Sequence, residues 1–527
     1  MQQAETIVLL FALVAALVII ARKLTVPYPV FLVVGGLALS FIPHLPEVKL
    51  NPNIFLYFFL PPLLYPAALF TSWRDFRRNL RPILLLAIGL VLFTMVAIAA
   101  VAHALIPVLP WAAAFALGAI VSPPDAIAAT SVIRRLSVPH RIQAILEGES
   151  LVNDATALVA LRFAVAALMT GSFSLGTAAL HFVWAAVGGV GFGLLVGFVM
   201  RWVQRHLDDP PVQITISLLT PFLAYLPAER LHASGVLAVV AAGIYLGWHS
   251  PLTIRPRTRI PLLAFWEIVT FLLNGFVFIT IGLQLPGIVR AIREDLLESH
   301  IKNALIISGA VILVRIGWVF VATYLPRLLS KKLRARDPYP PWKQVTIMAW
   351  AGMRGVVSLA AAFALPFVLP DGSPFPGRNY ILFLTFCVIL ATLVLQGLTL
   401  PLIIRKLRIG ADHSTDEEER SARVEANKAA IKLIEDLSKN GDFSSDTVDR
   451  LRAEYDERLQ QLELCAESPD DCSGQIASPQ FERLQQEALT AERRTIIELR
   501  NHHVINDEAL RRIQRDLDLA EARLTGG

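Results

Sequence analysis

Charged side chains are scarce in this sequence, and long apolar runs are abundant. Only 17% of its 527 residues are Asp, Glu, Lys or Arg, whereas 55% are hydrophobic. Soluble domains contain about 25% charged residues, so this composition argues against a chain that folds in water. It is typical of a polytopic membrane protein.

Cysteine is also rare, and the three cysteines match no metal-binding spacing. Cys387 lies in an apolar run, whereas Cys465 and Cys472 lie in the C-terminal region. We expect that region to face a reducing cytosol, and we expect the protein to need no cofactor. The first apolar run has no Lys/Arg-rich segment before it and no evident cleavage site, so it is predicted to be a retained span.

Acidic residues are depleted in the first part of the chain and concentrated in the last part. Residues 1–410 hold about 32 Lys/Arg and about 16 Asp/Glu, whereas residues 411–527 hold about 16 and about 27. The sequence therefore predicts a basic membrane domain, 1–410, and an acidic helical cytosolic domain, 411–527. The pI of 9.1 reflects the loops of the membrane domain and gives no support for nucleic-acid binding.

Thirteen apolar runs predict roughly thirteen transmembrane helices. A helix needs about 20 apolar residues to cross a bilayer, and the runs cover residues 5–21, 28–43, 54–70, 82–106, 111–132, 144–169, 179–200, 211–227, 234–249, 263–288, 303–325, 344–369 and 379–404. Alternate loops carry about 23 Lys/Arg against about 6 in the others, which assigns the first set to the cytoplasm. In this topology the N-terminus is outside the cell (inner) membrane and the C-terminus is cytoplasmic.

Two of these spans contain signals that break a helix. The fifth contains SPPDA, Ser122 to Ala126, whose two prolines remove backbone donors. The twelfth contains AGMRGVVS, Ala351 to Ser358, with two glycines around Arg354. Spans one to six and eight to thirteen have opposite orientations, as in many secondary transporters. The predicted fold is all-α, with two inverted six-helix repeats whose broken helices cross at mid-membrane.

Polar side chains interrupt the sixth run at GESLVND. Ionisable groups at membrane depth cost about 2.5–3.5 kcal/mol each on insertion scales, so they are rare and usually functional. Ser150 and Asp154 are four residues apart and share a helix face, and Glu149 and Asn153 share the adjacent face. An acid, a hydroxyl and an amide on one side of a buried helix could replace the hydration shell of a small cation.

The helix breaks and this polar segment should lie at the same depth. At about 1.5 Å per residue, Asp154 and Arg354 lie roughly 15 Å into their spans, and Asp125 lies roughly 21 Å into its span. All three positions are near the middle of a hydrocarbon core about 30 Å thick. Asp125 directly follows the proline break, where the carbonyl of Pro124 is available as a ligand.

The combination of GESLVND with SPPDA and GMRGVVS resembles the monovalent cation:proton antiporters, the sodium/proton exchanger family in its bacterial form. The resemblance extends through FLPPLLY, Phe59 to Tyr65, and FWEIVTFLLNGFVFITIGLQL, Phe265 to Leu285, and it covers roughly the first 405 residues. It implies a homodimeric secondary active antiporter, not an enzyme. The expected activity is exchange of cytosolic Na+, or of K+ or Li+, for external H+ in pH homeostasis.

The resemblance also implies roles for five residues of a Na+ site. Asp154 binds the cation and the proton in turn, and Asn153 and Ser150 contribute to cation binding. Asp125 and the backbone carbonyl of Pro124 complete the expected site. An Asn-Asp motif of this kind implies electroneutral exchange of one ion for one proton.

Buried arginines are expected to need partners. The resemblance implies that Glu149 and Arg354 form a structural ion pair across the core. Arg162 and Arg315 also lie inside apolar runs, and the sequence does not name their partners.

Two departures from the family pattern leave the choice among Na+, K+ and Li+ open. Pro124 stands where many relatives have a threonine, so only its backbone oxygen is available there. Pro66 and Ala67 stand where some relatives carry an acid.

Structural interpretations accompany the functional ones. Asp154 could merely hold helices together, and Asp125 could cap the helix after the proline break. For the whole protein, the alternative is a proton-coupled carrier of an organic solute, which would need a larger cavity. A channel would need a continuous polar pore, and an intramembrane hydrolase would need a paired aspartate or a Ser/His dyad. Sodium-dependent proton movement in vesicles distinguishes the antiporter from these alternatives.

Overall fold

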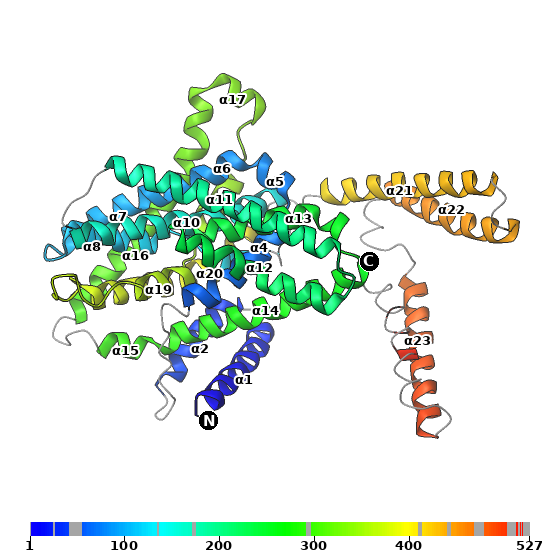
Figure 1. Cartoon of the computed structure of the whole chain (residues 1–527), viewed down its shortest axis with the longest axis horizontal. Coiled ribbons are helices and arrows are strands. Elements are labelled where there is room, and N and C mark those ends of the chain that lie inside the picture. Colours follow the sequence, from blue (N-terminus) through cyan, green and yellow to red (C-terminus); the bar gives the residue numbers. More distant parts are fainter. Residues whose placement is uncertain are drawn as a thin grey trace. The chain divides into compact units, whose positions relative to one another are not determined.

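The chain is helical throughout the part that the structure describes, and no β-strand element is found there (Figure 1). This computed structural model describes residues 2–24, 27–41, 55–133, 136, 138–170, 175–290, 297–408, 414–439, 444–467 and 479–502, with a few residues between 513 and 519. Its contacts divide the chain into two compact units, Met1–Asp412 and His413–Gly527. This boundary lies two residues beyond the predicted one.

The first part of the membrane unit contains short and interrupted helices as well as long ones. Its elements are α1 (Gln2–Lys23), α2 (Tyr28–Leu39), η1 (Phe55–Phe59), α4 (Leu60–Leu69), α5 (Trp73–Arg78), α6 (Leu80–Leu84), η2 (Leu85–Leu90), α7 (Val91–Leu105), α8 (Trp111–Val121), α9 (Ala126–Ile133) and α10 (His140–Thr170). The 31 residues of α10 give a length of about 46 Å, which exceeds the ~30 Å hydrocarbon core.

The second part of the unit repeats this mixture. Its elements are α11 (Leu175–Arg205), α12 (Pro210–Arg230), α13 (Gly235–Thr253), α14 (Pro256–Leu283), α15 (Leu285–Arg290), α16 (Leu297–Leu329), α17 (Lys331–Arg336), α18 (Trp342–Trp350), α19 (Val356–Phe363) and α20 (Arg378–Leu407). Nine helical segments of the described chain are long and apolar enough to cross a membrane, and α2 and residues 56–69 form shorter apolar helices. The protein is therefore a multi-pass membrane protein of the predicted all-α class, while the number of thirteen crossings stays a prediction.

Both predicted helix breaks are confirmed. The first separates α8 from α9 at Ser122–Asp125, where Pro123 and Pro124 supply no backbone N–H. The second separates α18 from α19 at Ala351–Gly355. Each break leaves two short helices whose ends point into the protein interior, where their unpaired backbone groups need partners.

Close helix packing supports the interior on the other side of α10. A Cβ atom added at Gly193 of α11 would lie 2.2 Å from the carbonyl oxygen of Ala238 of α13, and one added at Gly247 of α13 would lie 2.1 Å from that of Leu69 of α4. Glycine thus lets these backbones approach directly, as is common between membrane helices. The layer formed by α4, α11 and α13 packs along its length.

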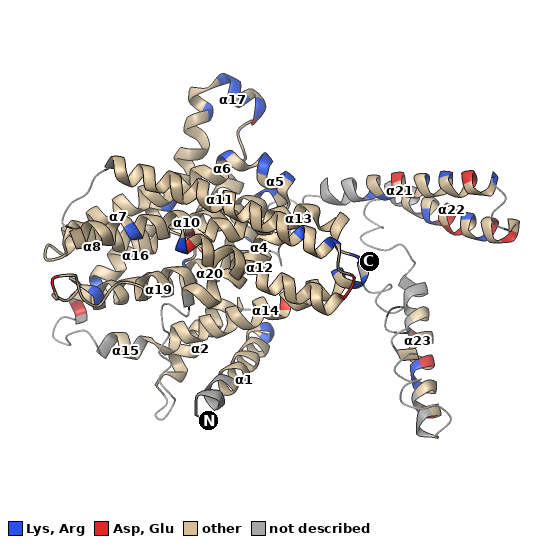
Figure 2. Cartoon of the chain, viewed as in Figure 1, with Lys and Arg blue, Asp and Glu red and all other residues tan. Residues whose placement is uncertain are grey.

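The C-terminal unit contains α21 (Ser414–Lys439), α22 (Ser445–Glu467) and α23 (Pro479–Asn501). Helices α21 and α22 pack as a hairpin, and the Arg452 guanidinium lies 2.9 Å from the Glu435 carboxylate. Charged residues of both signs cover them, whereas the membrane helices are mostly uncharged (Figure 2).

Candidate functional site

The two broken helices meet at their breaks. The backbone N–H of Asp125 donates a hydrogen bond of 2.7 Å to the carbonyl oxygen of Met353. In return, the Arg354 side chain donates through Nη1 to the carbonyl oxygen of Ser122. Two unwound segments more than 200 residues apart in sequence are therefore joined by one backbone hydrogen bond and one side-chain hydrogen bond.

The Asp125 carboxylate lies at the start of both short helices that follow the breaks. Its Oδ1 accepts a hydrogen bond of 2.8 Å from the Ile127 N–H of α9, and the N–H groups of Ala128 and Val356 also face it. A Cβ atom added at Gly355 would lie 1.8 Å from Asp125 Oδ2, so only glycine leaves room for this approach. The negative carboxylate stabilises the positive end of two helix dipoles at once.

Guanidinium groups occupy the opposite helix ends. Arg354 bonds to the Ser122 carbonyl at the end of α8, and Arg315 of α16 donates to the Met348 carbonyl of α18 over 3.1 Å. Helix C-termini carry partial negative charge and unpaired carbonyls, so both contacts are favourable. Together with Asp125, the two arginines compensate all four helix ends at the crossing.

Helix α10 brings Asn153 and Asp154 against this crossing. Asn153 is fully buried and donates through Nδ2 to the Pro124 carbonyl over 3.1 Å. Its Oδ1 is buried and has no hydrogen-bond partner among the described residues. The Asp154 carboxyl is only 5% exposed and lies within electrostatic range of Asp125. Four of the five residues expected at the Na+ site are thus brought together.

Ser150 stands slightly apart from this group. It lies one helical turn before Asp154 on α10 and is half-buried. Within the described residues it makes no hydrogen bond to its neighbours at the site, so its part in ion binding stays a prediction.

The prediction that Glu149 pairs with Arg354 is wrong, because Arg315 takes that place. Arg315 binds the Glu149 carboxylate with both ends of its guanidinium, Nη1 to Oε1 at 2.6 Å and Nη2 to Oε2 at 3.0 Å. Both side chains are 1% exposed. Arg354 instead extends toward Ser122 of α8, while its backbone N–H donates to Thr392 Oγ1 of α20. The isolated arginine in the eleventh apolar run was the signal that could have indicated this pair.

Arg162, the other arginine without a predicted partner, pairs with Glu229. Arg162 lies near the end of α10, and its guanidinium contacts Glu229 Oε2 near the end of α12. The second oxygen of Glu229 accepts the N–H of Gly235, at the start of α13, over 3.0 Å. This ion pair connects the helix of Asp154 to the α12–α13 turn, on the side of the molecule that the topology prediction assigns to the outside.

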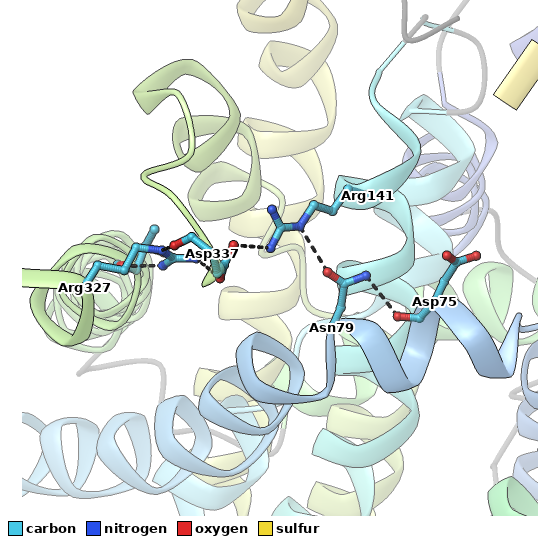
Figure 3. Close-up of polar contacts among 6 residues, drawn as sticks. Asp75, Asn79, Arg141, Arg327 and Asp337 are labelled. Atoms are coloured by element: carbon cyan, nitrogen blue, oxygen red, sulfur yellow. Dashed lines mark hydrogen bonds and ion pairs between the residues drawn. The ribbon is translucent and has the colours of Figure 1, made fainter. Parts of the chain in front are cut away.

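A second polar network, which the sequence did not indicate, lies at the other end of α10 (Figure 3). Arg141 donates through Nε to Asn79 Oδ1 at 3.1 Å and through Nη2 to Asp337 Oδ1 at 2.9 Å. Asp337 also pairs with Arg327, and Asn79 donates to the backbone oxygen of Asp75. The first turn of α10 is thereby connected to α5, α6 and the end of α16.

The same network changes the proton affinity of its central acid. Burial alone would raise the pKa of Asp337, but the guanidinium groups of Arg141 and Arg327 outweigh burial and hold that pKa below its usual value. Asp337 follows a run of basic residues, 327–336, and this isolated acid was the available sequence signal.

Comparison with known proteins identifies related chains. Residues 9–406 match the family described as "Sodium/hydrogen exchanger, transmembrane". The chain is 37% identical to a Mycobacterium tuberculosis protein named as an uncharacterized Na+/H+ exchanger, over 98% of this chain and 96% of the relative. It is 35% identical to the sodium, potassium, lithium and rubidium/H+ antiporter of Bacillus subtilis, over 83% of this chain and 66% of the relative.

The fold has a solved counterpart. The sodium proton antiporter MjNhaP1 from Methanocaldococcus jannaschii is similar with a TM-score of 0.60 and 21% identity, covering 77% of this chain and 99% of the other. At this identity the likeness shows the fold alone. The family match over most of the sequence and the 37% identical relative along nearly its whole length lead to one conclusion: the chain belongs to the sodium/hydrogen exchanger family of transmembrane transporters.

Proposed function

We propose that the protein exchanges cytosolic Na+ for external H+, one ion for one proton, at the carboxylate of Asp154. The observation that carries this proposal is the position of the buried Asn153–Asp154 pair against the break at Pro124–Asp125. Groups of this kind at membrane depth are rare and usually functional.

The oxygen atoms near Asp154 suit a small hard cation. Asn153 Oδ1 is buried without a hydrogen-bond donor among the described residues, and such an orphan acceptor is unfavourable until something satisfies it. The Pro124 carbonyl uses one lone pair for Asn153 and has a second available. With the carboxylates of Asp154 and Asp125, and with Ser150 on the adjacent turn, these groups offer an oxygen-rich environment for Na+.

The charge balance around the site supports a stoichiometry of one to one. Glu149 is neutralised by Arg315, and Asp125 is stabilised by the N-termini of α9 and α19. Among the described carboxylates at the crossing, Asp154 alone lacks a fixed positive partner. One Na+ or one H+ therefore suffices to neutralise it.

Competition for a single carboxylate explains why exchange is obligatory. When Asp154 carries either ion, the site is neutral and can change its exposure from one membrane face to the other. When it is empty, a bare anion would have to cross the hydrophobic interior, which is costly. Rocking of one helix bundle against the other then alternates access without ATP or a cofactor.

The cellular setting follows from the predicted topology. In a cell (inner) membrane with the N-terminus outside and the C-terminus in the cytoplasm, an inward proton gradient drives Na+ out and serves pH homeostasis. We expect the functional unit to be a homodimer. The name of the B. subtilis relative includes potassium, lithium and rubidium, so we include K+ and Li+ as candidate substrates. The family match does not favour the alternative of an organic-solute carrier.

Proton flux in inverted membrane vesicles tests this proposal. Addition of Na+, Li+ or K+ should release protons from vesicles that contain the protein, and the order of the responses gives the selectivity. Asp154→Asn should abolish the release, whereas Asp436→Asn on the exposed face of α21 serves as a matched control that should leave it intact. Absence of a response to all three ions from mildly acidic to alkaline pH would contradict the proposal.

A further inference from the structure

A large apolar cavity lies beside the helix that carries Asp154. It has a volume of about 520 Å³ and is bordered by α5, α6, η2, α10, α11 and α13. On α10 it is lined by Val152, Ala155, Thr156 and Val159, which share one helix face. At 100° per residue, Asp154 lies about 150° around the helix from the middle of that face. The cavity therefore lies on the face of α10 that is opposite to Asp154.

The cavity is shaped like a slot that follows the helix axes. Its wall on α13 extends from Leu237 to Trp248, and its wall on α11 extends from Phe182 to Leu194. These segments are about 17 and 18 Å long at ~1.5 Å per residue. The two walls are staggered, because Gly193 of α11 packs against Ala238 of α13. The α13 wall alone extends about 17 Å from Trp248, which is close to the ~15 Å depth of one leaflet in a hydrocarbon core ~30 Å thick, so this part of the slot matches the length of one acyl chain.

The lining excludes polar occupants. Apart from Thr156 and the tyrosine hydroxyl of Tyr245, the lining side chains are aliphatic or aromatic. Apolar cavities of this kind stay dry and bind apolar molecules. Leu194 is 44% exposed and Val190 is 40% exposed, so the slot opens sideways at a depth where its surroundings are lipid hydrocarbon.

Positive charge lies at one end of the slot. Trp73 of α5 and Trp248 of α13 form that end, and tryptophan is typical of the membrane interface. Arg77 and Arg78, on the same helix as Trp73, are exposed, and Figure 2 shows Lys or Arg positions on α5. Arg201 donates to the hydroxyl group of Tyr245, whose ring lines the slot. The topology prediction assigns this end to the cytoplasmic surface, where anionic lipids are concentrated.

We propose that this slot binds one acyl chain of an anionic phospholipid from the cytosolic leaflet, with its phosphate near Arg77, Arg78 and Arg201. The chain fills the space between α10 on one side and α11 and α13 on the other. Because Val152 and Ala155 flank the Asn153–Asp154 pair, the bound chain restrains the helix of the ion site. Its effect on exchange rests on the proposed antiport function, whereas its binding does not.

Photolabelling of the full-length protein tests the binding. The probe is phosphatidylglycerol with a diazirine on one acyl chain, in vesicles of equal parts phosphatidylcholine and phosphatidylglycerol. Val152 of α10 is half-buried and lines the slot, so a chain in the slot can reach it, whereas Ala155 and Thr156 are only 2% and 3% exposed. Labelling of this segment, located by mass spectrometry, is the expected result. Labels confined to exposed positions would overturn the proposal.

Variants that fill the slot provide the matched comparison. Ala241→Phe on α13 or Ala186→Phe on α11 adds a ring inside the slot, and overpacking of this kind should lower the α10 label about tenfold. Val187→Phe adds the same ring on the 65% exposed outer face of α11 and should leave the label unchanged. Equal labelling in all three variants would overturn the proposal, and having two slot variants guards against one that misfolds.

The headgroup requirement is tested with a phosphatidylcholine probe that carries the same diazirine chain. Weaker α10 labelling than with phosphatidylglycerol, and loss of that difference in Arg201→Gln, support the anionic-lipid assignment. Equal labelling by both probes overturns it. Cation-dependent proton flux is then measured in vesicles with and without phosphatidylglycerol. A protein that labels but shows no exchange with any lipid contradicts the proposed function, not the lipid site.

Discussion

The buried pair of Glu149 and Arg315 gives the sharpest test of how the core is held together. Each side chain is 1% exposed, so water does not screen the interaction. Removal of one partner leaves the other charge buried and uncompensated, which typically costs about 3–5 kcal/mol of stability. We therefore expect Arg315→Gln to lower the free energy of unfolding by that amount, and Glu149→Gln to do the same.

The double variant separates direct pairing from general damage to the core. With both charges gone, no uncompensated ion remains, so Glu149→Gln with Arg315→Gln should be much less unstable than the sum of the two single variants. The expected coupling energy is about 3 kcal/mol. Arg354 bonds to Ser122 and lies within electrostatic range of Glu149 without pairing with it, so the cycle of Glu149→Gln with Arg354→Gln should give a smaller coupling energy than the cycle with Arg315.

Unfolding by SDS in mixed micelles provides the measurement, because it titrates the stability of membrane proteins at constant pH. All variants keep Asp154 and are measured at the same lipid-to-detergent ratio. A coupling energy for Arg315 below that for Arg354 would refute the reasoning, since the bidentate contact would then contribute less than a residue that makes no ion pair with Glu149.

Three further predictions follow from other contacts. Gly355→Ala should abolish cation-dependent proton flux, because its Cβ would lie 1.8 Å from Asp125 Oδ2, whereas Gly309→Ala, with nothing within 4 Å, should leave the flux unchanged. Asp337 has a lowered pKa because its two arginine partners outweigh burial, so it stabilises the fold above its unfolded pKa of about 3.9 and loses this contribution as pH falls through the folded value. The melting temperatures of wild type and Asp337→Asn should therefore differ near neutral pH and converge in acid. Arg162→Gln should lower the free energy of unfolding by less than about 1 kcal/mol, because the Arg162 side chain is half exposed.

The helix breaks could be predicted because short sequence motifs are enough to cause them. Two consecutive prolines remove backbone donors wherever they stand, and glycines around an arginine permit close approach in any fold. The polar segment of α10 was visible for a similar reason, since a carboxylate in an apolar run is unusual in every membrane protein. Local rules sufficed for Pro124, Asp125, Asn153 and Asp154.

The partner of Glu149 could not be predicted in the same way. Arg315 and Arg354 are both arginines within apolar runs, and their positions in the sequence do not show which one pairs with Glu149. The rotation of α16 about its axis decides which one reaches α10, and this rotation results from packing over the whole unit. The network around Asp337 is a long-range property too, because Arg141 and Asp337 are 196 residues apart in sequence.

The contacts around the two helix breaks join residues that lie far apart in sequence, and this has a consequence for synthesis of the chain. Arg354 is synthesised 232 residues after Ser122, and Arg315 is synthesised 166 residues after Glu149. At ~5–20 residues per second, synthesis from Ser122 to Arg354 takes roughly 10–50 s. Until Arg315 has been made, α10 occupies the membrane while Glu149 has no counter-charge. The first half of the protein therefore lacks the groups that compensate the end of α8 and Glu149 until its second half has been translated.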